Sequence, residues 1–328
     1  HPLISPRGAM MVATHGEDAL LAEQWDVFRS VTPHARLLDS AQACALVPVL
    51  RPEKVLGAVL EPDAADMDVD AIHQGFLRGL RRAGGQVVCH AEVTALMREG
   101  DQWQVHAGGQ TYAAPVVINA AGAWADVVAA LAGVSAIGLE PRRRSAFIFA
   151  PPEGINSAAW PMIAGISEGW YFKPDAGMLL GSPANADPVT PQDIQPEELD
   201  IAMAIHRIEE MTTLTIRRPT RTWAGLRSFV AGGDLVGGVE QLLFLAGGAG
   251  RLWHSDLCRD GRGLRRTGAW LAVARTHCRI WTDRGHAVAG TVTPAELNAF
   301  CAVHASIRPL VLIGRAQAAV THGPAALN

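Results

Sequence analysis

Residues 116–131 form a segment that could bring the main chain close to a ligand. An apolar, largely β-branched run (Val116 to Ile118) leads into the small or short residues 119–122 and then into a helical pattern with Asp126 in its first turn. This order predicts a strand, a tight turn and a helix. Small residues at such a turn admit a ligand, and the helix N-terminus offers free N–H groups. An ordinary turn, small only for packing, fits the pattern as well.

Two arginines and one tyrosine have neighbours that favour carboxylate binding. Arg227 follows residues 223–226 and Arg144 precedes residues 145–147, segments that are mostly apolar or glycine. A guanidinium in such surroundings favours a bidentate carboxylate partner. Tyr171, one of two tyrosines in the chain, could hydrogen-bond the same ligand. Internal salt bridges for the arginines and a half-buried core ring for Tyr171 are the alternative interpretations.

Other catalytic patterns are weak or missing in the sequence. The pairs His254/Cys258 and His277/Cys278 lack a second matched pair, so no metal site is predicted. The sequence contains no G-x-S-x-G elbow, no P-loop, and no G-x-G-x-x-G after a strand. Chemistry carried by a side-chain nucleophile or a metal is therefore not expected.

Helical and alternating patterns predict the elements around these residues. Residues 68–83 repeat apolar positions with helical spacing and stop at two glycines, which predicts a helix. Residues 86–89 are predicted to form a buried strand, and residues 212–218 another strand. Hairpins are predicted around the turns at residues 98–101 and 174–177. The order of elements indicates an α/β layer followed by a mostly antiparallel module.

Composition bounds the class of protein. The chain has 328 residues, 49% hydrophobic and 18% charged, which is globular and long enough for one large or two ordinary domains. Its net charge of −4 gives no reason to expect nucleic acid. No run approaches the roughly 18 apolar residues of a membrane span, and no signal peptide is recognisable. The five scattered cysteines suggest reduced thiols and a cytoplasmic location.

Residues 251–328 differ in composition from the rest of the chain. They hold ten Arg, no Lys and four Asp or Glu, a net charge of +6 within a chain whose total is −4. Three of the five cysteines also lie there. Such a change indicates a domain boundary, a tail of different origin or an error.

Several long segments, taken together, resemble the FAD-dependent D-amino-acid oxidase/dehydrogenase family. VVINAAGAWAD, from residue 116, resembles the second flavin-contact segment of that family, and WAGLRSF, from residue 223, resembles its substrate-arginine segment. Further similarity, especially to D-arginine dehydrogenase members, covers about residues 1–247. It includes residues 46–58, 70–82, 143–155, 170–189 and 212–230.

The resemblance implies an α/β (α+β) fold, with a partial FAD-binding Rossmann-like domain and an antiparallel substrate domain. Substrate-domain elements are expected at residues 1–66 and 137–230, and parts of the FAD-binding domain at residues 67–136 and 231–250. The implied reaction is oxidative deamination of a D-amino acid by hydride transfer from Cα to flavin N5, giving a 2-oxo acid and ammonia. Because the flavin carries this chemistry, no catalytic side chain is expected.

The resemblance also assigns roles to residues. Arg227 is expected to bind the substrate carboxylate and Tyr171 to hydrogen-bond it, with Arg144 lining the same pocket. Met162 and Ala164 are expected near the substrate side chain. Val93 is expected to offer its backbone to the adenine end of FAD. The residues expected to pack along the cofactor are Asn119, Ala120, Ala121, Gly122 and Trp124.

The sequence departs from the family at its start. The family opens with a strand, G-x-G-x-x-G and a helix that hold the FAD pyrophosphate, and residue His1 falls after that unit. We therefore expect a fragment with weak flavin retention, which an absorbance scan of the purified protein tests. Ala9 stands where D-arginine dehydrogenase has an acidic residue. A guanidinium-bearing substrate thereby loses its ion partner.

The sequence departs from the family again at residues 247–250. Codons can be chosen for residues 251–262 that, read one base later, encode GYGIQTCAGMG, which resembles the family's closing segment. The same shift over residues 281–292 allows GLTEAMLSPARL, which resembles the family's ending. We therefore expect residues 251–328 to be an out-of-frame tail. Sequencing the gene tests this, because no single-base shift restoring GYGIQT would refute it.

Three functional hypotheses follow. The first is an FAD-dependent D-amino-acid dehydrogenase with a small-molecule substrate, an open choice of electron acceptor and no nucleic-acid or membrane partner. The second is a glycine/sarcosine-type amine oxidase that passes electrons to dioxygen. The third is a catalytically inactive fragment of such an enzyme.

Overall fold

A computed structural model describes residues 2–231 and the strands at residues 235–240, 243–247, 278–281, 287–289 and 310–314. It divides the chain into two compact units. Of the described residues, unit 1 holds 2–67 and 141–227, and unit 2 holds 68–140, 228–231 and the strands from residue 235 onward. The mixed α/β class expected from the sequence is confirmed. The assignment of the units to substrate and FAD binding, and the out-of-frame tail, which lies mostly outside the described residues, stay predictions.

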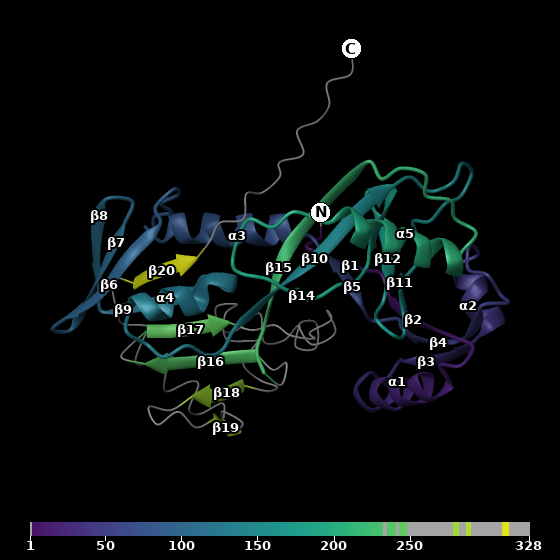
Figure 1. Cartoon of the computed structure of the whole chain (residues 1–328), viewed down its shortest axis with the longest axis horizontal. Helices are drawn as coiled ribbons and strands as arrows, with labels where there is room; N and C mark the ends of the chain where they lie inside the picture. Colours follow the sequence, from purple (N-terminus) through teal and green to yellow (C-terminus); the bar gives the residue numbers. More distant parts are fainter. Residues whose placement is uncertain are drawn as a thin grey trace, which may run out of the picture. The chain divides into compact units, whose positions relative to one another are not determined.

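Unit 1 is built on a nine-stranded sheet. Along the sheet the strands run β14-β10-β13-β12-β11-β2-β4-β3, and β15 pairs with β10 and runs alongside it (Figure 1). The strands are β2 (Ala9–Thr14), β3 (Arg36–Asp39), β4 (Val55–Glu61), β10 (Glu140–Phe149), β11 (Met162–Gly165), β12 (Tyr171–Asp175), β13 (Met178–Ser182), β14 (Asp187–Pro188) and β15 (Arg221–Phe229). A separate two-stranded ribbon pairs β1 (Ile4–Pro6) with β5 (Ala65–Met67). The predicted hairpin around residues 174–177 is confirmed as β12 and β13.

Side-chain alternation gives the sheet two different faces. On one face Ile163, Phe172 and Phe147 join the main hydrophobic core, which α2 (Ser40–Leu46) and α5 (Glu198–Met211) cover. On the other face Met162, Ala164 and Tyr171 form a smaller apolar cluster with residues of α1 (Asp18–Val31). The predicted strand at residues 212–218 is wrong, because only Thr212 forms a bridge there, to Leu50. Thr212 is fully buried, and its hydroxyl donates back to Ile208 of α5, so the segment caps the helix instead.

Unit 2 contains a six-stranded sheet in the order β19-β18-β16-β17-β9-β20 and a three-stranded sheet β6-β7-β8. The first is made of β9 (Val116–Ala120), β16 (Leu235–Glu240), β17 (Leu243–Gly247), β18 (Cys278–Trp281), β19 (Ala287–Ala289) and β20 (Leu310–Gly314). The second is made of β6 (Val93–Glu99), β7 (Gln102–Ala107) and β8 (Gln110–Ala114). β9 runs parallel to both of its neighbours, β17 and β20. The predicted hairpin at residues 98–101 is confirmed as β6 and β7.

The predicted helix at residues 68–83 is confirmed as α3 (Val69–Arg82), capped by the Asp68 carboxylate, which accepts a hydrogen bond from the Ala71 N–H. The buried strand predicted at residues 86–89 is wrong. Val87 and Val88 are 40% and 52% exposed, and no described strand pairs with them. An apolar run becomes a buried strand only when a neighbouring strand satisfies its backbone, and the described part of the chain supplies none here.

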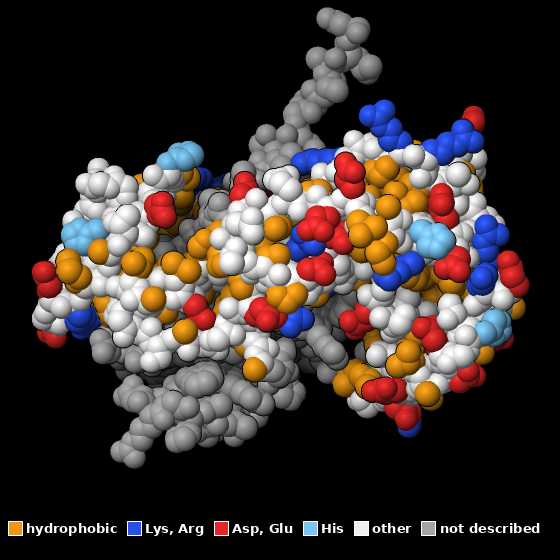
Figure 2. Space-filling model, viewed as in Figure 1, with side chains coloured by type: hydrophobic (Ala, Val, Ile, Leu, Met, Phe, Trp, Pro, Cys, Tyr) orange, Lys and Arg blue, Asp and Glu red, His pale blue; other side chains and the backbone are white. Residues whose placement is uncertain are grey.

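The described surface mixes charged and apolar side chains. On the face shown in Figure 2, acidic and basic side chains are interspersed over the described residues. Among those residues no helix combines the length and hydrophobicity that crossing a membrane requires. The same residues contain no group of three or more His, Cys, Asp or Glu placed to hold a metal ion.

A buried arginine fastens α5 and β14 to the sheet. Arg143 of β10, only 8% exposed, forms ion pairs with Glu197 at the start of α5, with Asp200 at 3.2 Å and with Asp187 of β14 at 3.4 Å. Burial alone would lower the pKa of the Arg143 guanidinium, but the three carboxylates outweigh it and raise that pKa. Burial raises the pKa of the Asp200 carboxyl, and Arg143 partly offsets this. Among the described residues, Arg143 is therefore the one cation that these three carboxylates share.

A second ion-pair cluster fastens the β1–β5 ribbon. Asp66 accepts hydrogen bonds from Arg7 Nε and Lys173 Nζ, both at 2.7 Å. Arg7 also donates to the main-chain oxygens of Ala158 and Trp160, which precede β11. Burial alone would raise the pKa of the Asp66 carboxyl, but the hydrogen bonds and charges of Lys173 and Arg7 outweigh it, so that pKa is lowered.

We expect Arg143→Met to destabilise unit 1 by about 3 kcal/mol, because it leaves a partly buried carboxylate group without its cation. Urea unfolding, monitored by tryptophan fluorescence, measures the free energy of unfolding. Arg29→Met is the matched control, since Arg29 forms an exposed pair with Asp26 and should cost less than about 1 kcal/mol. Equal losses in the two variants would contradict a structural role for the buried cluster.

We expect Asp66→Asn to lower stability only above acidic pH. A carboxyl whose pKa is lowered by folding stabilises the protein above its unfolded pKa of about 3.9, and this stabilisation is lost as the pH falls through the folded value. The difference in unfolding free energy between wild type and variant should therefore be constant near neutral pH and shrink below about pH 4. A difference that does not change down to pH 2 would show that Asp66 acts by packing rather than by charge.

Candidate functional site

Strand register in unit 1 brings together the predicted substrate residues. Ala164 of β11 lies opposite both Met11 of β2 and Tyr171 of β12, and Met162 lies opposite Ala9. Direct partners share a face of the sheet. Met162, Ala164 and Tyr171 accordingly lie in the same apolar cluster, with Met162 and Ala164 buried and Tyr171 half-buried.

Arg144 enters the same face from β10. Ile148 lies opposite Leu180, which lies opposite Lys173, so Arg144, four residues before Ile148, shares the face of Tyr171. Its side chain is half-buried, and its Nε donates to the main-chain oxygen of Asn185 at 2.6 Å.

The electrostatics of Arg144 show what surrounds it. Burial lowers the pKa of the Arg144 guanidinium, and the positive charge of Arg227 lowers it further. A hydrogen bond with Tyr171 and the charge of Glu168 act in the opposite direction. Arg144, Tyr171 and Arg227 are thus neighbours, and Arg227 is exposed. Within the described residues, neither arginine forms a salt bridge.

Ala9 occupies the position where the family's D-arginine dehydrogenase members have an acid. It is half-buried and lies between Met162 on one side and Glu61 on the other, its partners in the neighbouring strands. Glu61 is 8% exposed, and its Oε1 accepts a long hydrogen bond of 3.4 Å from the Thr32 hydroxyl. An acid beside position 9 is therefore present, but it belongs to the next strand.

Two residues of this cluster were not predicted from the sequence. Glu168 lies in the turn between β11 and β12, in a left-handed conformation with φ +58°. Asn185 follows β13, and its main-chain oxygen binds Arg144 while its side chain donates to Asp200 and Asp187. Asn185 therefore joins the ion pairs of Arg143 on one face to Arg144 on the other. In the sequence, the only indication of a role for these two residues was their position in loops next to strands that carry predicted site residues.

The predicted cofactor turn in unit 2 is organised by Asn119. This residue is fully buried at the end of β9, where its Nδ2 donates to the Ala125 oxygen at 2.8 Å and its Oδ1 accepts from the Ala121 N–H at 3.2 Å. A short 3-10 turn (Gly122–Trp124) and α4 (Ala125–Leu131) follow. Gly122 has φ +58°, and a Cβ added there would meet nothing within 4 Å. The turn therefore presents small residues beside open space.

Neighbouring elements hold this turn in place. Ala120 and Trp124 are half-buried, and Trp124 packs against the same hydrophobic cluster as Val93 at the start of β6. The Asp126 carboxylate accepts the N–H groups of Ile137 and Leu139 at 3.0 and 2.8 Å, which fixes the chain leaving α4. A small-residue turn fixed from both sides suits close approach by a flat cofactor ring.

Solved structures share this fold. Glycine oxidase from Geobacillus kaustophilus matches with a TM-score of 0.67 and 21% identity, over 76% of this chain and 67% of that one. L-proline dehydrogenase from P. horikoshii matches with a TM-score of 0.65 and 18% identity, over 82% and 76%. L-α-glycerophosphate oxidase from Mycoplasma pneumoniae, solved with FAD bound, matches with a TM-score of 0.68 and 17% identity, over 77% and 70%.

The sequence itself matches a family model described as FAD dependent oxidoreductase (DAO), over residues 1–254. The match spans well over half of the chain and includes the Asn119 turn and all the arginines discussed above. The chain therefore belongs to the DAO family of FAD-dependent oxidoreductases, and its cofactor is FAD.

Proposed function

We propose that this chain takes part in the FAD-dependent oxidative deamination of a D-amino acid, and that it descends from an enzyme of the D-arginine dehydrogenase type. One observation carries the proposal. Arg144 and Arg227 lie close enough for the charge of one to lower the pKa of the other, and within the described residues neither has a salt-bridge partner.

Two guanidinium groups whose positive charges act on each other are stabilised by an anion bound beside them. Arginine binds carboxylates in a bidentate manner, and the interaction is stronger where one group is partly removed from water. The α-carboxylate of an amino acid is such an anion. Tyr171, hydrogen-bonded to Arg144, orients the same end of the site.

The apolar cluster beside the arginines suits the remainder of the substrate. Met162 and Ala164 are 8% and 1% exposed and lie next to Tyr171. They supply an apolar wall, and Ala9 adds no charge to it. The neighbouring acid Glu61 is buried and accepts a hydrogen bond from the Thr32 hydroxyl. We therefore propose a substrate whose side chain is apolar or small, rather than a guanidinium.

FAD, when bound, would supply the hydride acceptor for oxidation of the substrate at Cα, and hydrolysis of the resulting imino acid by water would give a 2-oxo acid and ammonia. The residues proposed to hold FAD are those of the Asn119–Gly122 turn, with Trp124 and the backbone of Val93. The protein residues bind and orient the substrate. No side-chain nucleophile is needed.

We expect Arg227→Met to raise the KM for a D-amino acid such as D-leucine about 100-fold, because a charged hydrogen bond to the carboxylate is lost. Dye reduction with FAD added in excess measures this, and a parallel assay with dioxygen separates a dehydrogenase from an oxidase. Arg221→Met, on the same strand and stacked over Trp223, is the control and should leave KM unchanged. Ligand-observed NMR of D-leucine gives the same comparison without flavin. Equal affinity in the two variants would refute the assignment of Arg227.

We expect Ala9→Glu to improve D-arginine as a substrate about tenfold in kcat/KM relative to D-leucine, because it supplies an ion partner for the guanidinium. Glu61 lies opposite this position, and a nearby like charge raises the pKa of the introduced carboxyl. The gain should therefore grow as the pH rises from 6 to 8. Ala9→Gln is the uncharged control. A gain of the same size in Ala9→Gln would show that shape, not charge, sets the preference.

A further inference from the structure

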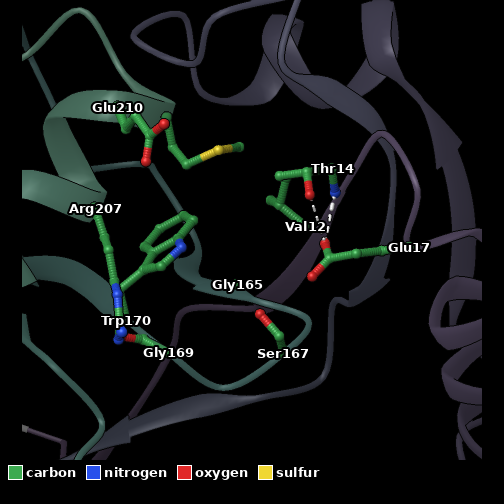
Figure 3. A pocket seen from close by; sticks show the side chains of 10 residues that line it. Val12, Thr14, Glu17, Gly165, Ser167, Gly169, Trp170, Arg207 and Glu210 are labelled. Carbon is green, nitrogen blue, oxygen red and sulfur yellow. Dashed lines mark hydrogen bonds between the residues drawn. The ribbon is translucent and has the colours of Figure 1, made fainter.

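A cavity lies in unit 1, away from Arg144, Tyr171 and Arg227, which we call the arginine cluster. Its volume is about 430 Å³, within the range of small-molecule sites. It opens where β2 and β11 end, with the start of α1 on one side and the end of α5 on the other (Figure 3). Arg144, Tyr171 and Arg227 do not line it. Its buried lining residues Val12, Trp170 and Met211 belong to the main core, on the sheet face opposite Tyr171.

The cavity has an apolar wall with a fixed aromatic ring. Trp170 is 6% exposed and stacks on Phe172, with ring centroids 6.0 Å apart and an angle of 18° between the planes. Met211 and Val12 are 5% and 0% exposed and extend this wall. Gly165 leaves room for the indole, because a Cβ there would lie 2.6 Å from Trp170 Nε1.

The charged side chains at the cavity include one carboxylate that has no ion pair among the described residues. Glu17 and Glu210 contribute two carboxylates and Arg207 one guanidinium. Arg207 Nη1 is already engaged with the main-chain oxygen of Gly169 at 2.7 Å. Glu210 Oε1 lies 3.8 Å from Lys54 Nζ, so among the described residues the Glu17 carboxylate is the lining acid that has no ion pair, and it favours a cation beside it.

Only one of the two carboxylate oxygens of Glu17 takes part in the hydrogen bonds that hold the side chain in place. Its Oε2 accepts from the N–H and the hydroxyl of Thr14, at 2.7 and 2.9 Å. Its Oε1 makes no hydrogen bond within the described residues. Figure 3 shows that second oxygen turned toward the space above Ser167. A fixed carboxylate facing an aromatic ring across a cavity is suited to an ammonium group.

We propose that this cavity binds a small organic ammonium ion, with the ammonium on Glu17 and a short alkyl body against Trp170 and Met211. The Glu17 carboxylate repels an anion at this position. A metal ion lacks ligands, because the described residues bring no three metal-binding side chains together. The proposal is independent of the proposed function, since no residue of the arginine cluster takes part.

Binding of butylammonium to the full chain, measured by calorimetry and by ligand-observed NMR, tests the proposal. Butanol and butyrate serve as neutral and anionic probes of similar size. Butylammonium should bind about tenfold more tightly than either, because only it forms a charge-assisted hydrogen bond with Glu17. Equal affinities for the three probes would overturn the proposal.

Three variants locate the site. Glu17→Gln keeps an oxygen for Thr14 but removes the charge, and should weaken butylammonium binding about tenfold. Glu23→Gln, an exposed residue of the same helix, removes the same charge outside the cavity and should change nothing. Arg227→Met should also leave this binding unchanged, which separates the cavity from the substrate cluster. Unchanged affinity in Glu17→Gln, or an equal loss in Glu23→Gln, would overturn the proposal.

A further variant keeps the test decisive if the Glu17→Gln protein does not fold. Ser167 is exposed at the cavity, so Ser167→Leu should fill it without disturbing the core. Butylammonium binding should then be abolished while near-ultraviolet circular dichroism stays unchanged. Retained binding in a folded Ser167→Leu protein would contradict the proposed location.

Discussion

The alternation of side chains across the sheet of unit 1 is the constraint on which the rest of this unit depends. Neighbouring residues of one strand serve different purposes because they face opposite ways. Arg143 holds α5 through the ion pairs of its buried guanidinium, whereas Arg144 faces Tyr171 and Arg227. Phe172 lies in the main core, and Tyr171, one residue earlier, lies in the cluster with Ala164. A shift of one residue in register would bury the polar set and expose the core.

Asn185 connects the two faces. Its main-chain oxygen accepts from Arg144, and its side chain donates to Asp187 and Asp200, which neutralise Arg143. The position of the half-buried Arg144 is thereby tied to the ion pairs that fasten α5. Burial disfavours the charged form of the Arg144 guanidinium, and the positive charge of Arg227 disfavours it further. An anion bound beside the two arginines would offset both effects.

The loop between β11 and β12 lies beside two different environments. Glu168 acts electrostatically on Arg144, whereas Gly169 and Trp170 line the cavity beside Glu17. The arginine cluster offers positive charge and suits a carboxylate. The cavity offers negative charge beside an indole and suits an ammonium. Opposite charges on the two sides of one short loop would favour different ligands at the two proposed sites.

Local patterns in the sequence were sufficient to predict the amphipathic helix α3, the hairpins and the strand-turn-helix around Asn119. Each of these depends on contacts between residues that are near neighbours in the chain. The strand expected at residues 86–89 was wrong, since a strand needs a partner and the sequence pattern does not say whether one is present. Motif similarity was sufficient to nominate Arg144, Tyr171 and Arg227. Only the tertiary structure placed Glu168 and Asn185 beside them, because those contacts depend on which loops the sheet register brings together.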